Sequence, residues 1–286
     1  MRAVPAAARP GDGGDAPWVV IDAARGRNPI DPVELWHYRD LLYFLTWRDI
    51  SVRYKQTLLG CLWAILQPFL TMVVFTVFLG RLAGVPSDGV PYPVFSYLGL
   101  LPWMYFSGAV TRGGSSLVSN AHLLTRVYFP RVLLPLSATL SALVDFAIAF
   151  VVLGGLMAWY GLAPAPTVLL LVPLLLVTAC AATGVGMGLA GLNARYRDVQ
   201  YAIPFVMQLW MFATPVVYPA SLVPDAWRPL LALNPMAGLV EAYRAATLGR
   251  PLDWPTLGIS CATTALLVAL GVWWFRRIER TLADVV

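Results

Sequence analysis

Charged side chains are scarce in this sequence. They make up 12% of its 286 residues, about half the share found in an average soluble domain, whereas 59% of the residues are hydrophobic. Between residues 132 and 194 the only charged side chain is Asp145. So few charges cannot cover the surface of a water-soluble domain, and the composition therefore predicts an integral membrane protein.

Residues that bind nucleotides or metals are also few. The single lysine, Lys55, is followed by Gln, whereas a Walker A loop needs Lys followed by Ser or Thr. If ATP drives this protein, another chain binds the ATP and its Mg²⁺. The two histidines, His37 and His122, have no cysteine or carboxylate nearby at metal-ligand spacing. We therefore expect no cofactor, metal site or catalytic residue in this chain.

The positive charge is scattered rather than concentrated. The net charge of +5 comes from arginines at the ends of apolar segments, not from one basic stripe. A nucleic-acid partner is disfavoured, because tracking phosphates needs a contiguous basic surface. The excess of positive residues in cytoplasmic loops of membrane proteins explains the same arginines better.

The predicted fold is all-α, with six membrane spans and both termini in the cytoplasm. Residues 1–30 are expected to be a disordered cytoplasmic tail, 31–56 an amphipathic interfacial helix, and 57–286 a six-helix transmembrane domain. The six predicted spans are 58–80, 95–117, 133–159, 166–192, 200–218 and 255–275. The second span is the least regular, since it holds Pro102, Arg112 and two glycines, and we expect it to tilt or to break near its inner end.

The interfacial helix has start signals in Asp31 and Pro32, and Asp49 and Arg53 are spaced for an i,i+4 ion pair. A soluble helix that packs on a partner protein is the alternative. The helix also carries the cationic residues Arg48, Arg53 and Lys55 beside aromatic ones. At a membrane surface these cations are candidates for contacts with an anionic lipid head group.

Two segments between the spans have distinct patterns. Residues 219–254 contain short apolar patches separated by prolines, which predicts two short helices that dip into the outer leaflet, with a Glu241–Arg244 pair. Residues 120–131 predict a short helix with exposed apolar side chains, typical of a docking surface. An ordinary interfacial loop is the alternative for 120–131.

Gly186–Gly191 matches the dinucleotide fingerprint GxGxxG, but it lies within an apolar run without a preceding strand. Gly184 and Gly188 instead have the spacing at which small residues allow two membrane helices to approach closely. Helix packing is the favoured interpretation.

Asp145 and several aromatic residues are candidates for lining a pathway. A carboxylate within an apolar span is costly unless it is paired or hydrated, so Asp145 either borders a polar pathway, accepts from an interhelical donor, or lies near the interface. Aromatic side chains in the spans either belong to an interfacial belt or face lipid, or they line a pathway where they stack on sugar rings. The candidate aromatic residues are Trp63, Phe69, Phe75, Trp210, Phe212 and Tyr218.

Five segments together resemble one family. They are WRDISVRYKQTLLGCLWAILQPF (47–69), NAHLLTRVYFPR (120–131), LNARYRDV (192–199), TPVVYP (214–219) and LNPMAGLVEAYRAATLG (233–249). In this order they resemble the membrane subunit of ABC exporters for polysaccharides such as O-antigen, capsule-like and teichoic acid chains. The resemblance covers essentially everything after residue 30.

The resemblance implies a homodimer of six-helix subunits that works with two cytosolic ATPase subunits. It implies that 31–56 is a gate helix, that the outer helices shape the periplasmic exit, and that the cargo is an undecaprenyl-linked glycan. It also implies a coupling helix that seats on the ATPase and includes Asn120, His122, Leu123, Leu124, Arg126, Tyr128 and Phe129. The alternatives are an ABC exporter of a small lipid or drug, a membrane-embedded glycan or acyl transferase, and an ATP-independent channel.

Overall fold

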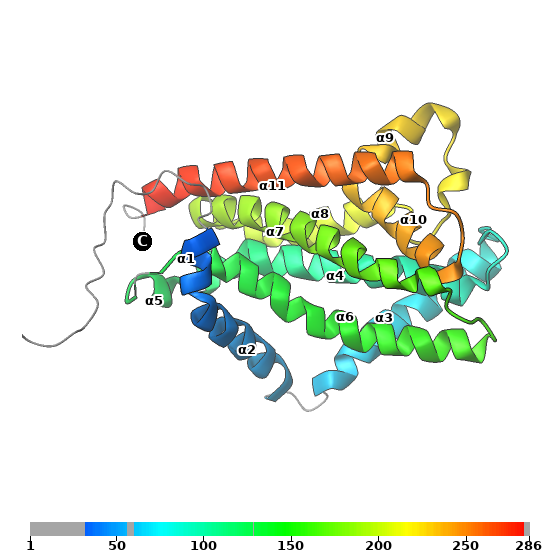
Figure 1. Cartoon of the computed structure of the whole chain (residues 1–286), viewed down its shortest axis with the longest axis horizontal. Coiled ribbons are helices and arrows are strands. Elements are labelled where there is room, and N and C mark those ends of the chain that lie inside the picture. The colour runs from blue at the N-terminus through cyan, green and yellow to red at the C-terminus, as the bar shows by residue number, and fades with distance from the viewer. Residues whose placement is uncertain (1–31, 56–59, 128, 283–286) are drawn as a thin grey trace, which may run out of the picture.

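The computed structural model describes residues 32–55, 60–127 and 129–282, and all of the regular structure in these ranges is helical. Four long helices run along the bundle: α4 (Tyr92–Ser119), α6 (Leu133–Trp159), α7 (Leu171–Arg195) and α11 (Trp254–Leu282). Figure 1 shows them side by side, with α2 below α6 and α3 crossing α6 in that view. The prediction of an all-α fold is confirmed.

Helix α4 is the centre of the bundle. It packs against α7, α6, α10 and α3, and most of its side chains are buried, including Tyr97 and Phe106. It is continuous over 28 residues, about 42 Å, so the expected break near its inner end does not occur. Cys180 and Cys261 are free thiols exposed on the surface of the bundle.

Four helical stretches are long and apolar enough to cross a membrane: Leu62–Leu82, Leu133–Trp159, Pro166–Arg195 and Trp254–Glu279. The first is α3 (Gly60–Phe75) continued by the π-helix η2 (Thr76–Leu82), and the third begins with the 3₁₀ turn η3 (Pro166–Leu170). The predicted fifth span contains α8 (Val199–Phe212), whose 14 residues rise only about 21 Å. Within the described residues there are thus four candidate spans by length and composition, and α4 and α8 lie outside this set.

The predicted N-terminal helix is divided into two. Helix α1 (Pro32–His37) ends in a turn at Tyr38, and α2 (Arg39–Lys55) then crosses α6 obliquely (Figure 1). Leu45 is the buried residue of α2, whereas Val52 is 56% exposed. Asp31 and the expected tail lie outside the described residues.

The opposite end of the bundle carries two 3₁₀ turns, η4 (Ala220–Leu222) and η5 (Asp225–Trp227), then α9 (Arg228–Ala232) and α10 (Pro235–Leu248). The sequence defines α10 well. Asn234 caps its start by accepting from Met236 N, proline occupies the first turn, and Gly249 ends it in the left-handed conformation at φ 69°. Helix α10 is largely buried, and the predicted Glu241–Arg244 pair is confirmed at 2.8 Å.

Asn234 also joins α10 to the end of α8. Its carbonyl oxygen accepts from Trp210 Nε1 at 3.0 Å, and its amide donates to Thr214 Oγ1 at 2.8 Å. We expect Asn234→Ala to reduce the free energy of unfolding by about 2 kcal/mol, because it removes a helix cap and leaves an indole N–H without its acceptor. Thermal unfolding of purified protein measures this. Asn234→Ser, which keeps only the cap, should recover about half of the loss, and equal stability of Ser and Ala variants would contradict the role in joining the helices.

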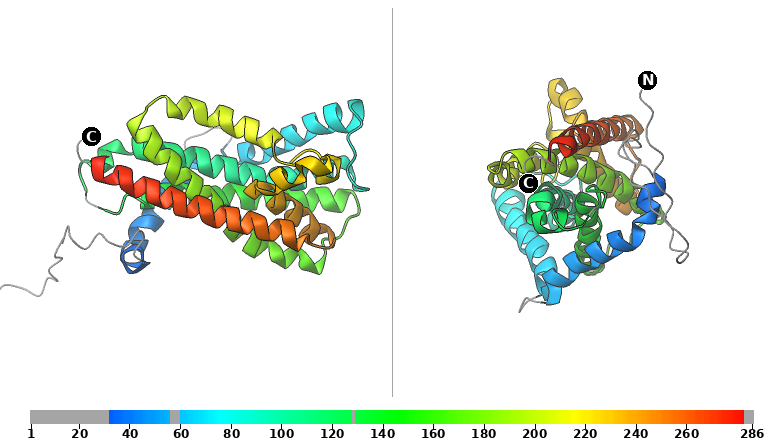
Figure 2. Two further views of the ribbon diagram at one scale, coloured as in Figure 1. Left: turned by 90° about the horizontal axis from the view of Figure 1, so that it is seen from above. Right: turned by 90° about the vertical axis from the view of Figure 1, so that its left-hand side faces the viewer.

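The two ends of the bundle differ in the segments they carry. Figures 1 and 2 place α1, α5 (Ala121–Leu124) and the C-terminal end of α11 at one end, and α9 and the α6–η3 connection at the other. Arg126 lies just after α5, Arg195 is the last residue of α7, and Arg276 belongs to the C-terminal part of α11, so these arginines lie on segments at the α5 end. This is the grouping that the predicted topology requires of the arginine-rich loops.

Candidate functional site

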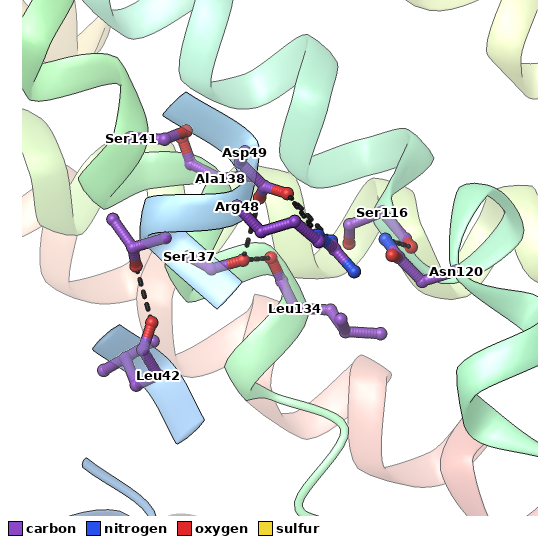
Figure 3. A network of polar contacts seen from close by, with 10 residues as sticks. Leu42, Arg48, Asp49, Ser116, Asn120, Leu134, Ser137, Ala138 and Ser141 are labelled. Atoms are coloured by element: carbon purple, nitrogen blue, oxygen red, sulfur yellow. Dashed lines mark hydrogen bonds and ion pairs between the residues drawn. The ribbon is translucent and has the colours of Figure 1, made fainter. Parts of the chain in front are cut away.

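Polar contacts attach α2 to α6 at two levels. At the first level, Asp49 accepts from Arg48, with an Nη2 to Oδ1 distance of 2.8 Å, and from the hydroxyl of Ser137 on α6 at 3.3 Å (Figure 3). The guanidinium of Arg48 points towards the end of α4 that carries Ser116 and Asn120 (Figure 3). The first level is therefore a neutral pair fixed to a serine of the neighbouring helix.

The second level lies one turn further along α2 and contains more charge. The Arg53 guanidinium donates to Oδ2 of Asp145 on α6, and the Tyr54 hydroxyl donates to Oδ1 of the same carboxylate. Arg112 Nη2 from α4 lies 3.5 Å from Oδ2. One carboxylate on α6 thus faces two guanidinium groups and a phenol from two other helices, and we call Arg53, Tyr54, Arg112 and Asp145 the Asp145 cluster.

The Asp145 cluster is deep but not sealed. Asp145 is twelve residues after the start of α6, about 18 Å along the helix. The side chains of Arg53, Asp145 and Arg112 remain 31%, 29% and 32% exposed. Charges at such a depth need partners, and the remaining exposure leaves room for a ligand that approaches from the side of the bundle.

The structure separates the three cations predicted for a lipid head group. Arg48 pairs with Asp49, Arg53 pairs with Asp145, and Lys55 is exposed at the end of α2. The expected i,i+4 pairing of Asp49 with Arg53 is replaced by these two pairs. Arg53 thus attaches α2 to α6, whereas Arg48 pairs within α2, and a ligand must compete with a carboxylate for either arginine.

Sequence reasoning missed Tyr54, Arg112 and Ser137 as members of this region. Arg112 had a usable signal, because a charged residue in the middle of a long helix otherwise poor in charge calls for a partner. Gly108, one turn before it, supports the position: a Cβ there would lie 3.4 Å from both terminal guanidinium nitrogens of Arg112. Tyr54 and Ser137 had no such signal.

The predicted coupling residues fall into three groups. His122 and Arg126 are exposed, as is the neighbouring Val127 at 56%. Leu123 and Leu124 are half-buried, because they pack on a small apolar cluster that includes Leu45 and Leu117. Phe129 is buried in the same cluster, Asn120 bonds to the Ser116 carbonyl at 2.9 Å, and Tyr128 lies outside the described residues. The helix itself spans only Ala121–Leu124, which is shorter than expected.

The predicted pathway aromatic residues do not form one group. Trp63, Phe69 and Phe212 are exposed, whereas Phe75 packs partly against the core. Trp210 lies edge-on to Phe106 at 5.2 Å and to Trp103 at 6.4 Å. The Tyr218 hydroxyl donates to the Phe212 carbonyl at 3.0 Å, and Asp145 lies in its own cluster. The two exposed sets come from α3 and α8, which occupy the same side of the bundle in both views of Figure 2.

Comparison with known proteins identifies the family of this chain. Residues 40–248 match the ABC-2 type transporter family, which covers α2 through α10 and thus both the Asp145 cluster and α5. This chain belongs to the ABC-2 type transporter family. As a member of that family it is an integral membrane transport protein, and the resemblance expected from its sequence segments is confirmed.

Several members of the ABC-2 type transporter family are similar over nearly their whole length. The O-antigen export system permease protein RfbA of Myxococcus xanthus is 36% identical over 252 residues, which cover 86% of this chain and 96% of the relative. The protein of the same name from Klebsiella pneumoniae is 27% identical over 249 residues, covering 86% and 95%. The polysialic acid transport protein KpsM of Escherichia coli is 24% identical over 242 residues, covering 82% and 92%.

Proposed function

We propose that this chain is the membrane subunit of an ABC exporter that moves a lipid-linked polysaccharide, O-antigen or teichoic-acid-like, across the cytoplasmic membrane. The carrying observation is the 36% identity to an O-antigen export permease over 96% of that relative. The chain contributes the membrane pathway and no catalytic residue. ATP and Mg²⁺ bind to a separate nucleotide-binding subunit.

The proposed topology has six spans and cytoplasmic termini in the bacterial inner membrane. Helix α4 counts as a span because its length is sufficient and the surrounding helices cover its less apolar side chains. Residues 213–218 form turns that lead from α8 to the end that carries α9 and α10, and α8 together with these turns is the proposed fifth span. The end with α5 and the arginine-rich connections then faces the cytosol, while α9 and α10 face the periplasm.

The proposed assembly is two copies of this chain with two ATPase subunits. The exposed aromatic residues of α3 and α8, including Trp63, Phe69 and Phe212, make one side of the bundle a candidate for the second copy and for the glycan pathway. Trp210, Tyr218, Phe75 and Asp145 are the further proposed members of the pathway. The cationic end of α2, with Arg48, Arg53 and Lys55, is the proposed entrance for the anionic head group.

The function is tested by inactivating the gene in its host and measuring polysaccharide at the cell surface. We expect surface polysaccharide to disappear and lipid-linked polysaccharide to accumulate on the cytosolic side, with both effects reversed by the wild-type gene. Unchanged surface polysaccharide would refute the proposal. If the chain instead exported a small lipid or drug, inactivation of its gene would leave the glycan at the cell surface. If it were a transferase, the purified chain would convert a lipid-linked substrate without an ATPase partner.

The coupling segment gives a more specific prediction. Val127 is 56% exposed at the proposed cytosolic end, beside the exposed His122 and Arg126. We expect Val127→Asp to weaken binding of the ATPase subunit about 30-fold, because a carboxylate would replace an apolar contact at a protein interface. Co-purification of the tagged complex in detergent measures the binding. Leu222→Asp, at a residue 50% exposed at the opposite end, is the matched control and should retain the ATPase; equal retention in both variants would exclude this segment from docking.

A further inference from the structure

The Asp145 cluster contains more positive than negative charge. Arg53 and Arg112 share one oxygen of Asp145, while Tyr54 occupies the other, so these side chains together carry one surplus positive charge. The neighbouring Arg48–Asp49 pair is neutral and does not offset it. A surplus cation within a helical membrane bundle is costly and favours an anion beside it.

Arg112 is the less completely paired of the two arginines. Its closest described acidic partner is at 3.5 Å, and its Nε is buried without a hydrogen-bond partner among the described residues. The guanidinium lies beside Gly108, where an added Cβ would be in contact with both terminal nitrogens at 3.4 Å. A planar guanidinium with donors still available is suited to bidentate contact with a phosphate group.

The position of the cluster determines what kind of anion can reach it. Arg53 and Tyr54 lie at the end of α2, and α2 and α3 form the outer edge of the bundle in the end-on view of Figure 2. The side chains of Arg53, Arg112 and Asp145 are about one third exposed, and in the proposed topology they lie within the depth of the membrane. A phosphate attached to a membrane lipid can approach laterally, whereas a free anion would have to leave water.

We propose that the Asp145 cluster is an exchange site in which the phosphate group of a membrane lipid replaces the Asp145 carboxylate between Arg53 and Arg112. This inference rests on the proposed function and assigns its head-group contact to Arg112 and Arg53, with Asp145 as the resident competitor. Because Asp145 also fixes the end of α2 to α6, exchange loosens α2 when the lipid binds. The lipid phosphate thus controls the attachment of the gate helix.

The test measures binding of radiolabelled undecaprenyl pyrophosphate to the full-length chain, co-expressed with its ATPase subunit and placed in phosphatidylcholine nanodiscs. Arg112→Gln lowers the cluster charge to zero and should weaken binding about tenfold, whereas Asp145→Asn raises it to +2 and should tighten binding about tenfold. The double variant has the wild-type charge and should bind with near wild-type affinity. Affinities that do not follow this order would overturn the proposal.

Glycine variants keep the test valid if removal of Asp145 prevents folding. Gly108→Ala places a methyl group against the Arg112 guanidinium without changing any charge, and should weaken binding several-fold. Gly154→Ala is the matched control, because no atom lies within 4 Å of the added Cβ. Equal affinities of these two variants would count against a site built around Arg112.

Competition identifies the lipid. Neutral undecaprenol and inorganic pyrophosphate should compete poorly, and strong competition by either would overturn a site for a lipid phosphate. Phosphatidylglycerol that competes as well as undecaprenyl pyrophosphate would support the site with bilayer phospholipid as its ligand, and poor competition would support the lipid carrier. Surface polysaccharide measured in parallel separates the two proposals. If all variants export polysaccharide normally and bind the lipid like the wild type, only the exchange site is refuted. If inactivation of the gene leaves surface polysaccharide unchanged, the proposed function is refuted.

Discussion

Arg244→Ala should destabilise the proposed periplasmic end of the bundle by about 3–5 kcal/mol, enough to prevent accumulation of folded protein in the membrane. Arg244 is 3% exposed and donates to three acceptors: the Pro215 carbonyl at 2.8 Å, the Val216 carbonyl at 2.5 Å and Glu241 at 2.8 Å. Its guanidinium also lies 3.8 Å from the centre of the Phe95 ring. Alanine would leave two buried carbonyls without donors and Glu241 without its counter-ion.

The reason for the large effect is that one side chain connects three segments. Arg244 belongs to α10, its acceptors belong to the 213–218 turn after α8, and Phe95 belongs to α4. Gly99 on α4 permits this arrangement, because a Cβ there would collide with the Val216 carbonyl and the Arg244 guanidinium. Lysine cannot reproduce the forked contacts, so Arg244→Lys should recover only part of the stability.

Arg228→Ala is the matched control for this prediction. Arg228 is also an arginine at the outer end, and it pairs with Asp225 at 2.9 Å, but its side chain is 57% exposed. Exposed pairs contribute about 0–1 kcal/mol, so this variant should unfold near the wild-type temperature. Thermal unfolding followed by size-exclusion chromatography of a fluorescent fusion compares the two. Similar unfolding temperatures for both alanine variants would show that Arg244 does not hold the outer end together.

Sequence patterns predicted elements whose signals are local. Helix α6 begins and ends at the predicted residues 133 and 159, since an uninterrupted apolar run has one stable conformation in a membrane. Helix α10 follows from its Asn–Pro start and its glycine stop, and the Glu241–Arg244 pair follows from i,i+3 spacing. Helix α8 was less predictable, because the apolar run continues after Phe212 while the backbone turns.

The candidate site depended on contacts between distant residues. Arg53 and Asp145 are 92 positions apart, so spacing could not show that they pair, and Asp49 offered Arg53 a nearer partner in sequence. Arg112 was visible as a charge in a weak span but not as a member of the same cluster. In the same way, the acceptors of Arg244 are backbone carbonyls 28 and 29 positions away, and any residue type would have supplied them.

The second large effect concerns the contact between α7 and α11. Gly184 and Gly271 touch through their backbones: a Cβ on Gly271 would overlap the Gly184 carbonyl, and a Cβ on Gly184 would lie 2.7 Å from the Val268 Cα. Because both obstacles are backbone atoms, no side-chain rotation can relieve the clash. We expect Gly271→Val to separate the helices and abolish folded protein, and Gly184→Ala to cost at least about 3 kcal/mol, the upper range for overpacking.

The control lies within the same glycine motif. Gly188 also faces Gly271, but its added Cβ would lie 3.9 Å from the Gly271 Cα, an ordinary van der Waals contact. The free energy of unfolding of Gly188→Ala should therefore lie within about 0.5 kcal/mol of that of the wild type, because the substitution creates neither a clash nor a cavity. If the GxGxxG sequence bound a cofactor, substitutions of Gly186, Gly188 and Gly191 would have the largest effects, and those of Gly184 and Gly271 would not. Equal losses of stability from Gly188→Ala and Gly184→Ala would contradict the packing geometry, whereas a loss confined to Gly184 and Gly271 follows from two helices whose backbones meet at those residues.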